Sequence, residues 1–139
     1  MSYYKKIAVA IDFSEHSIKA FEKATSIALH HKATLVLANV VDTKTFGSIA
    51  AYDLKFKEQM KAENLVQLKS LKEQALAKGI ESVEISLEEG SPKEILTQLP
   101  NVDLILCGET GYNKFEKFML GSVADRILRL SKYDVLIIK

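Results

Sequence analysis

Four small residues near the C-terminal end of the chain have a spacing that suits phosphate binding. Two residues separate Gly108 from Gly111, and nine residues separate Gly111 from the pair Gly121 and Ser122. A glycine leaves no Cβ between a backbone N–H and an approaching anion. The N–H groups at the start of a following helix have no partner within the helix and lie at the positive end of its dipole. The spacing therefore predicts a loop that closes around a phosphate chain.

This pattern differs from two better-known phosphate signatures. The P-loop needs a Gly-Lys pair, and the chain contains none; the dinucleotide fingerprint Gly-x-Gly-x-x-Gly is also absent. The nine inner residues could span up to ~30 Å if extended, which is enough to leave the sheet edge and return to it. The motif that remains is Gly-x2-Gly-x9-Gly-Ser.

The glycine loop lies in a chain in which apolar runs alternate with helical patterns. Nearly unbroken apolar runs indicate buried strands, whereas alternation of apolar and polar residues indicates a strand with one wet face. The runs occupy residues 6–11, 34–41, 103–107 and 134–138, and the alternating segment occupies residues 83–87. Four helices are predicted. The first is capped by Ser14 and runs to about His31, and the second runs from near Asp53 to Lys78. The third begins in a capping box at residues 91–94 and ends at about Leu99, and the fourth runs from about Val123 to Ser131.

Regular alternation of strand and helix predicts an α/β fold with a five-stranded parallel sheet and helices on both faces. Because the third strand is wet on one face, we place it at the sheet margin, which gives the doubly wound, Rossmann-like order 3-2-1-4-5. Asp12 follows the first strand and Gly108 ends the fourth. In this order both residues flank the crevice where strand order reverses, the usual ligand site of such sheets.

The last strand would form an edge of this sheet. Val135, Leu136, Ile137 and Ile138 show no polar alternation. An exposed apolar edge invites pairing with another chain. We therefore predict a homodimer joined through this C-terminal strand.

Composition places the chain among ordinary globular proteins. Its 139 residues, 47% hydrophobic and 27% charged with a formal charge of +1, predict a single domain over residues 1–139 and no nucleic-acid partner. The first apolar segment is too short for a signal peptide or a membrane span, so a cytoplasmic location without membrane contact is expected. The single cysteine, Cys107, lies in an apolar run, where a buried structural role is favoured.

Other reactive side chains have simpler explanations. Ser14 and His16 lack the geometry of a nucleophile and its base, and Ser14 is better explained as a helix cap. His30 and His31 lie at the C-terminal end of a helix, where they interact favourably with the helix dipole, so we assign them no metal. No catalytic set of residues emerges, and at most slow ATP hydrolysis is expected.

In these residues the chain resembles a known family, the universal stress proteins, and within it the ATP-binding branch. The resemblance spans the chain through residues 5–14, 39–42, 121–125 and 134–138, and the glycine spacing marks the branch. It implies the adenine nucleotide alpha hydrolase-like form of the fold. It also implies ATP or another adenine nucleotide as ligand, with Mg²⁺ bound to its phosphates and no metal held by the protein alone.

Carried over by position, the resemblance also implies roles for individual residues. Asp12 would lie near the ribose or the phosphate-bound Mg²⁺, and Gly108 near the ribose. The base pocket would be formed by Ala10, Ile11 and the backbone of Val40. The residues implied for the phosphates are Gly111, Gly121, Ser122 and Val123.

One departure from the family pattern concerns Glu109 and Thr110, which stand where many relatives have small, polar or basic residues. A carboxylate ~6 Å from one phosphate charge costs on the order of 0.7 to 3 kcal/mol, depending on the effective dielectric. Glu109 is therefore expected to weaken ATP binding.

Three functions follow from these observations. The first is an ATP-binding protein of stress response or signalling whose dimer or partner contacts change with nucleotide. The second is a nucleotide-free dimeric interaction module, and the third is a slow ATPase.

Overall fold

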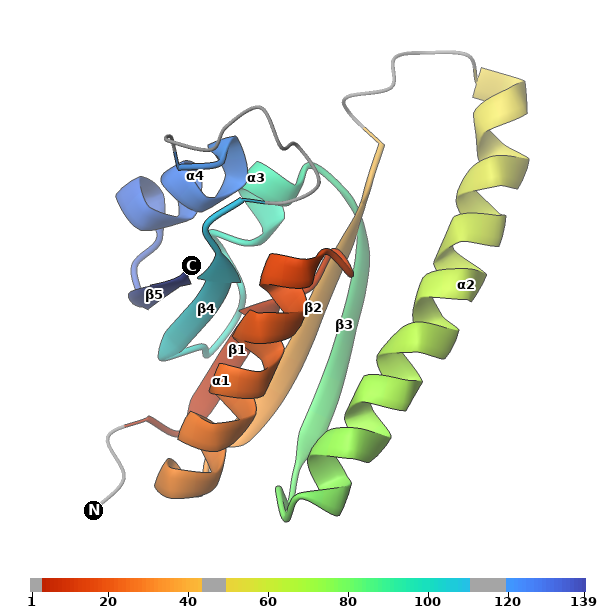
Figure 1. Ribbon diagram of the computed structural model, residues 1–139. Coiled ribbons are helices and arrows are strands. Elements are labelled where there is room, and N and C mark those ends of the chain that lie inside the picture. Colours follow the sequence, from red (N-terminus) through yellow and green to blue (C-terminus); the bar gives the residue numbers. More distant parts are fainter. Residues whose placement is uncertain (1–3, 44–49, 111–119) are drawn as a thin grey trace.

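The computed structural model in Figure 1 describes residues 4–43, 50–110 and 120–139, with residues 50–53 described by their backbone alone. Of the predicted site residues, Gly111 lies outside this part of the chain.

Five parallel strands form one sheet. They are β1 (Lys6–Ala10), β2 (Thr34–Asp42), β3 (Val83–Gly90), β4 (Leu104–Gly108) and β5 (Asp134–Ile138). All four neighbouring pairs are parallel, and the order is β3-β2-β1-β4-β5. The predicted doubly wound topology is confirmed.

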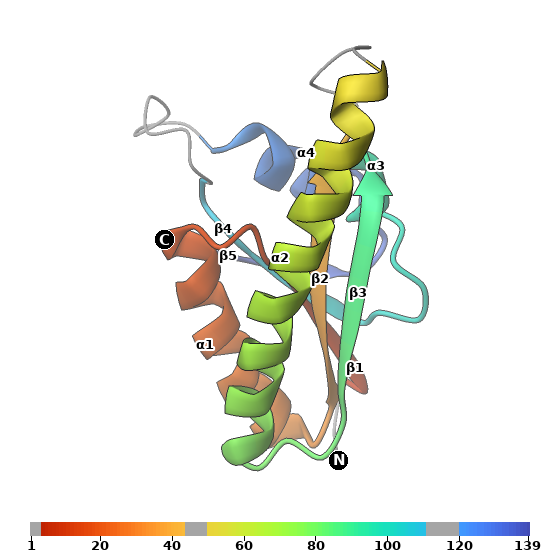
Figure 2. The same ribbon diagram turned by 90° about the vertical axis from the view of Figure 1, so that its right-hand side faces the viewer.

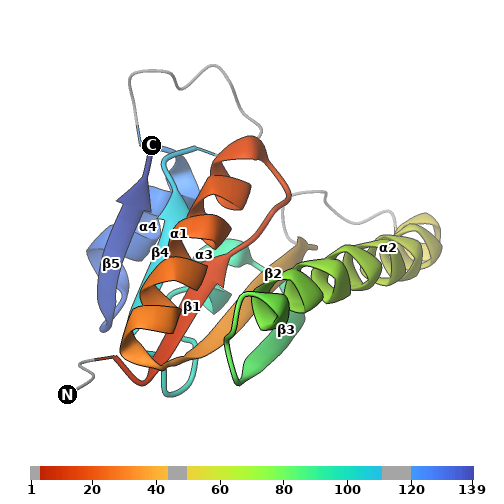
Figure 3. The same cartoon turned by 60° about the horizontal axis from the view of Figure 1, so that its bottom comes forward.

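Helices cover both faces of this sheet, as Figures 1 and 3 show from two directions. The helices are α1 (Glu15–His31), α2 (Ala50–Ala77), α3 (Pro92–Ile95) and α4 (Ser122–Leu130). Helices α1 and α2 lie on one face, and α3 and α4 lie on the other. Figure 2 shows the long helix α2 running beside β2 and β3.

Alternate strand residues build two apolar cores, one on each face. In β1, Ile7 and Val9 face the core under α1 and α2, whereas Ala8 faces the core under α3 and α4. Each of these three side chains is fully buried. Burial on both faces explains why the strand sequences are nearly unbroken in their apolarity.

Helix α1 begins and ends as its sequence predicts. The Ser14 hydroxyl accepts a hydrogen bond from the N–H of Ser17, which satisfies a backbone donor of the first turn. At the other end Lys32 adopts a left-handed conformation with φ 55°, and His30 and His31 lie in the last turn. The cap assigned to Ser14 is confirmed.

The predicted capping box at residues 91–94 is wrong. The Ser91 side chain makes no cap hydrogen bond, and α3 ends at Ile95 rather than near Leu99. The Tyr133 hydroxyl explains the early end, because it donates to the carbonyl of Leu96 and accepts from the N–H of Leu99. This tertiary contact holds the segment in a turn that buries both leucines.

The two edge strands differ in how their side chains are shielded from solvent. Strand β5 lies at one edge, as predicted, and Leu136 is 37% exposed there. Strand β3 forms the other edge, where Glu89 pairs with Lys57 and Lys61 of α2, each at 3.5 Å. Within the ranges that the structure describes, no helix is long and apolar enough to cross a membrane.

The contact between α1 and β4 depends on the absence of a side chain at Gly108. A Cβ placed there would lie 2.6 Å from the Cβ of His16 and 3.0 Å from its backbone carbon. Backbone cannot yield as a flexible side chain does, so a larger residue would push the helix away from the strand.

We expect Gly108→Ala to lower the free energy of unfolding by about 1–3 kcal/mol, because it forces this overpacked contact apart. Urea unfolding followed by circular dichroism measures the change. Ser122→Ala, at an exposed position at the start of α4, is the control and should alter stability little. A Gly108→Ala protein as stable as the wild type would contradict the close approach.

Candidate functional site

The sheet opens at the point where its winding reverses. The chain leaves β1 toward α1 on one face and leaves β4 toward α4 on the other. Pairing between β1 and β4 ends at Val9 and Leu106, one residue before β1 and β2 end their pairing at Ala10. A cavity of about 260 Å³ lies at these carboxyl ends. Its position is the one expected for ligand binding in an open parallel sheet.

The structure brings together in this cavity every predicted site residue that it describes. They come from the ends of β1, β2 and β4 and from the start of α4: Ala10, Ile11, Asp12, Val40, Gly108, Gly121, Ser122 and Val123. Gly111 lies outside the described residues, so its position relative to the cavity is not assigned.

One part of the cavity is an apolar slot. Ala38 and Val40 of β2 line it, together with Pro92 and Leu96 at the two ends of α3 and with Cys107 of β4. Sequence reasoning missed Pro92 and Leu96 because they reach the site from the opposite face of the sheet through α3. The slot has the character that binds a flat, weakly polar ring.

The other part of the cavity is the start of α4. The N–H groups of Ser122 and Val123 stand in the first turn, where no intrahelical acceptor exists, and both residues line the cavity. The N–H of Gly121 donates instead to the carbonyl of Glu109 at 2.8 Å. This arrangement can stabilise an anion at the positive end of the helix dipole.

A second hydrogen bond fixes the other side of Glu109. Its N–H donates to the carbonyl of Ile138 in β5 at 2.7 Å. The backbone of Glu109 is therefore tied to α4 through Gly121 and to the edge strand through Ile138. These bonds define how far apart the walls of the cavity stand.

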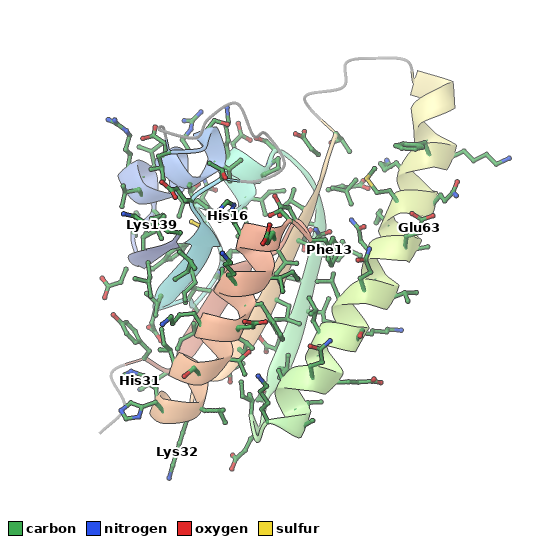
Figure 4. All side chains as sticks on the ribbon, viewed as in Figure 1. Phe13, His16, His31, Lys32, Glu63 and Lys139 are labelled. Carbon is green, nitrogen blue, oxygen red and sulfur yellow. The ribbon has the colours of Figure 1, made fainter. Side chains whose placement is uncertain are left out.

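Asp12 forms a tight turn between β1 and α1. Its Oδ1 accepts the N–H of Ser14 at 2.9 Å, and its own N–H donates to the Ser17 hydroxyl at 3.3 Å. Phe13 takes a left-handed backbone with φ 65°, which is costly for a residue with a side chain. Figure 4 shows Phe13 directed to the α2 side of α1, where its ring packs on the apolar core. Asp12 itself is exposed and lines the cavity.

A buried amide pair behind the cavity was missed by the sequence analysis. Asn39 is only 4% exposed; its Nδ2 donates to the carbonyl of Ile11 at 2.7 Å. Its Oδ1 accepts from Nδ2 of Asn64 in α2 at 3.1 Å. An asparagine inside the apolar run of residues 34–41 was the available signal, because a buried amide needs partners.

His16 was considered only as a nucleophile's base, and the structure gives it a different contact. Its Nδ1 lies 3.1 Å from the Thr110 hydroxyl, and Thr110 lines the cavity. Figure 4 shows His16 on the side of α1 that faces β4. His16 thus supports the cavity wall from behind, and Ser14 remains a helix cap.

The site contains a single thiol. Cys107 is 3% exposed, and burial raises the pKa of its thiol from the ordinary 9.0 to about 12. A neutral buried thiol is a poor nucleophile, so the predicted structural role is consistent with its surroundings. Across the described ranges, no group of three or more His, Cys, Asp or Glu side chains could hold a metal ion.

Comparison with protein families agrees with this architecture. The sequence pattern of the Universal stress protein family matches residues 3–139. The chain belongs to the universal stress protein family. This family of stress-response proteins was the one that the sequence segments resembled.

Two bacterial relatives illustrate the similarity of this universal stress protein to its family. A relative from Staphylococcus saprophyticus, named for the same family, is 40% identical over 143 residues, which cover all of this chain and 86% of that protein. A relative from Staphylococcus aureus strain USA300, also named for the family, is 40% identical over 145 residues with the same coverage.

Solved structures share the fold. Universal stress protein UspA from Lactobacillus plantarum superposes with a TM-score of 0.90 at 23% identity and full coverage of both chains. A universal stress protein crystallised in complex with cAMP superposes with a TM-score of 0.76 at 30% identity, with 99% of each chain covered. The first likeness concerns the fold alone, whereas the second is also a sequence relationship.

The buried thiol predicts how this universal stress protein responds to alkaline solution. Because the folded pKa is raised, the unfolded chain loses the Cys107 proton first, and stability falls as pH rises from the unfolded toward the folded value. Between about pH 8 and about pH 10 this one group removes about 1.4 kcal/mol from the free energy of unfolding.

Urea unfolding of the wild type and of Cys107→Ala at both pH values isolates the effect, since tyrosines and lysines titrate in both proteins. The wild type should lose more stability than the variant by about that amount. Equal losses would show that the thiol is hydrated in the folded protein.

Proposed function

We propose that this universal stress protein binds an adenine nucleotide in the cavity at the carboxyl ends of β1, β2 and β4. One observation carries the proposal: an apolar slot and an uncapped helix start open into the same cavity. The apolar lining of the slot suits a purine, and the helix start matches a phosphate in charge. Few other ligand classes need both features side by side.

The proposed orientation follows from the cavity walls. The base lies in the slot against Val40 and beside Ala10 and Ile11, which line the same cavity, with backbone groups at the end of β2 available to its polar edge. The ribose lies beside Gly108, which lines the cavity at the end of β4. The phosphates meet the amides of Ser122 and Val123 and the hydroxyl of Ser122.

Gly121 contributes through its missing side chain. Because its N–H is donated to Glu109, its part in the proposal is to let phosphate approach the start of α4. Gly111 is proposed for the phosphates on the glycine spacing and the resemblance, since it lies outside the described residues.

Asp12 suits a Mg²⁺ ion bound to the phosphates. Only Oδ1 of its carboxylate is engaged among the described residues, so Oδ2 is available at the exposed cavity wall. Magnesium in nucleotide sites is commonly held by one or two carboxylates together with phosphate oxygens and water. Asp12 would therefore meet the ion through its free oxygen or through a water, and the ion would neutralise part of the phosphate charge.

A relative supports the ligand class. The universal stress protein whose crystal structure contains cAMP is 30% identical to this chain over 99% of its length. Cyclic AMP has the base, ribose and phosphate that the cavity is proposed to hold. ATP, the ligand implied by the glycine spacing, adds phosphates that extend along the start of α4.

The proposed physiological role is that of a cytoplasmic stress-response or signalling protein whose assembly changes with bound nucleotide. The thiol in the described cavity is buried and neutral, which makes it a poor nucleophile. Binding rather than turnover is therefore proposed as the activity.

Ser122→Asp tests the phosphate contact without weakening the fold. An aspartate in the first turn of a helix favours the dipole, so α4 should remain at least as stable. The added charge repels phosphate, and affinity for ATP with Mg²⁺ should fall roughly tenfold or more. Isothermal titration calorimetry measures both proteins, and thermal unfolding without ligand checks the fold.

Ser70→Asp adds the same charge on the exposed surface of α2 and is the matched control. It should bind ATP as the wild type does. The nucleotide proposal fails if the wild type shows no binding of ATP, ADP, AMP or cAMP at millimolar ligand. The proposed phosphate contact at the start of α4 is excluded if Ser122→Asp binds ATP as tightly as the wild type.

We further propose a homodimer joined through the β5 edge. Strand β5 has a neighbour on one side only, β4, and the partly exposed Val135, Leu136, Ile137 and Ile138 lie along it. Unpaired backbone groups beside apolar side chains favour pairing with a second copy.

Leu136→Asp should produce monomers, because it places a charge on the proposed apolar contact without entering either core. Sedimentation velocity at micromolar concentration measures the change. Val66→Asp, at a position 68% exposed on α2, is the control and should remain dimeric. A wild type that sediments as a monomer would exclude the dimer.

A further inference from the structure

We infer that Glu109 is a specificity-determining residue that makes the cavity select against uncompensated negative charge on the ligand. This inference rests on the proposed nucleotide binding and defines the class of nucleotide that is favoured. The preferred ligands are the Mg²⁺ complex of ATP and nucleotides with little phosphate charge. Metal-free ATP is disfavoured.

The position of Glu109 is fixed by its backbone. Its N–H donates to Ile138 at 2.7 Å and its carbonyl accepts from Gly121 at 2.8 Å, so two elements hold it at the cavity wall. Glu109 is half-buried and lines the cavity directly after Gly108. The backbone of Glu109 therefore stays beside the start of α4, where the phosphates are proposed to lie.

The charge of Glu109 is not neutralised by a neighbouring cation in the described structure. None of the ion pairs between described residues includes Glu109 or Asp12. The described cavity wall contains these two carboxylates and no lysine, arginine or histidine. Two negatively charged residues therefore line the same cavity as the helix start that attracts anions.

Repulsion by the carboxylates and attraction by the start of α4 together make binding depend on the charge of the ligand. Repulsion from a fixed carboxylate grows with each negative charge on the ligand, whereas the amides of a helix start bind one or two phosphate oxygens. The apolar slot contributes equally for every adenine compound. The net preference therefore falls as uncompensated phosphate charge rises, and Mg²⁺ restores affinity by lowering that charge.

Glu109→Gln is the direct test, because it removes one charge and keeps the side-chain length. Calorimetric titrations compare adenosine, AMP, metal-free ATP with EDTA, and ATP with Mg²⁺. Affinity for metal-free ATP should rise roughly tenfold in the variant, and affinity for ATP with Mg²⁺ should rise less. Adenosine should bind both proteins equally.

Salt provides a readout that a purely structural role would not alter. The gain for metal-free ATP should shrink at high ionic strength, because screening weakens repulsion between partly exposed charges. Glu73→Gln, on the exposed face of α2, changes the net charge equally and should leave all four affinities unchanged. Thermal unfolding without ligand should be the same in all three proteins.

The outcomes separate this inference from the proposed function. If the wild type binds none of the four ligands, both proposals fall. If the wild type binds nucleotide but Glu109→Gln binds metal-free ATP no more tightly, charge selection by Glu109 is excluded while nucleotide binding stands. A uniform change across all ligands, adenosine included, would likewise exclude it.

Discussion

The structure depends on burying a parallel sheet on both of its faces. Each strand of such a sheet must be followed by a helix that covers one face, and right-handed crossovers decide which face it covers. Between β1 and β4 the direction of winding reverses, so α1 and α4 leave on opposite sides. No element can fill the space between the two departing chains. The cavity is thus a geometric result of covering the sheet, and the residues at the strand ends determine what it can hold.

Glu109 joins three parts of the molecule that are far apart in the sequence. Its backbone contacts the edge strand at Ile138 and the start of α4 at Gly121, and it lines the cavity. The proposed ligand site and the proposed dimer edge are therefore one hydrogen bond apart. A ligand that shifts the start of α4 would act on β5 through a single residue. This short connection offers a physical route by which nucleotide could influence assembly.

Local sequence signals predicted most of the fold, because strand burial and helix caps depend on residues that are close together in the sequence. Ser14 capped its helix as predicted, and the strand order followed from the wet face of residues 83–87. The prediction failed at the end of α3, where Tyr133, more than thirty residues away, holds the backbone at Leu96 and Leu99. Gly108 and Gly121 of the glycine pattern line the cavity, but the pattern did not predict the wall formed by α3. Pro92 and the contact of His16 with Thr110 reach the cavity through tertiary packing, which local patterns do not encode. The same holds for Asn64, which binds Asn39 behind the cavity.

The left-handed backbone at Phe13 has a consequence for recognition. Such a conformation costs of the order of 1–3 kcal/mol, and the packing of the aromatic ring against the core offsets it. The turn that carries Asp12 is therefore ordered before any ligand arrives. The proposed ligand would therefore meet a turn that is already ordered, and association would cost the protein little conformational freedom there. The cost of the left-handed conformation at Phe13 is therefore part of the folding free energy of the ligand-free protein, and the turn is rigid as a result.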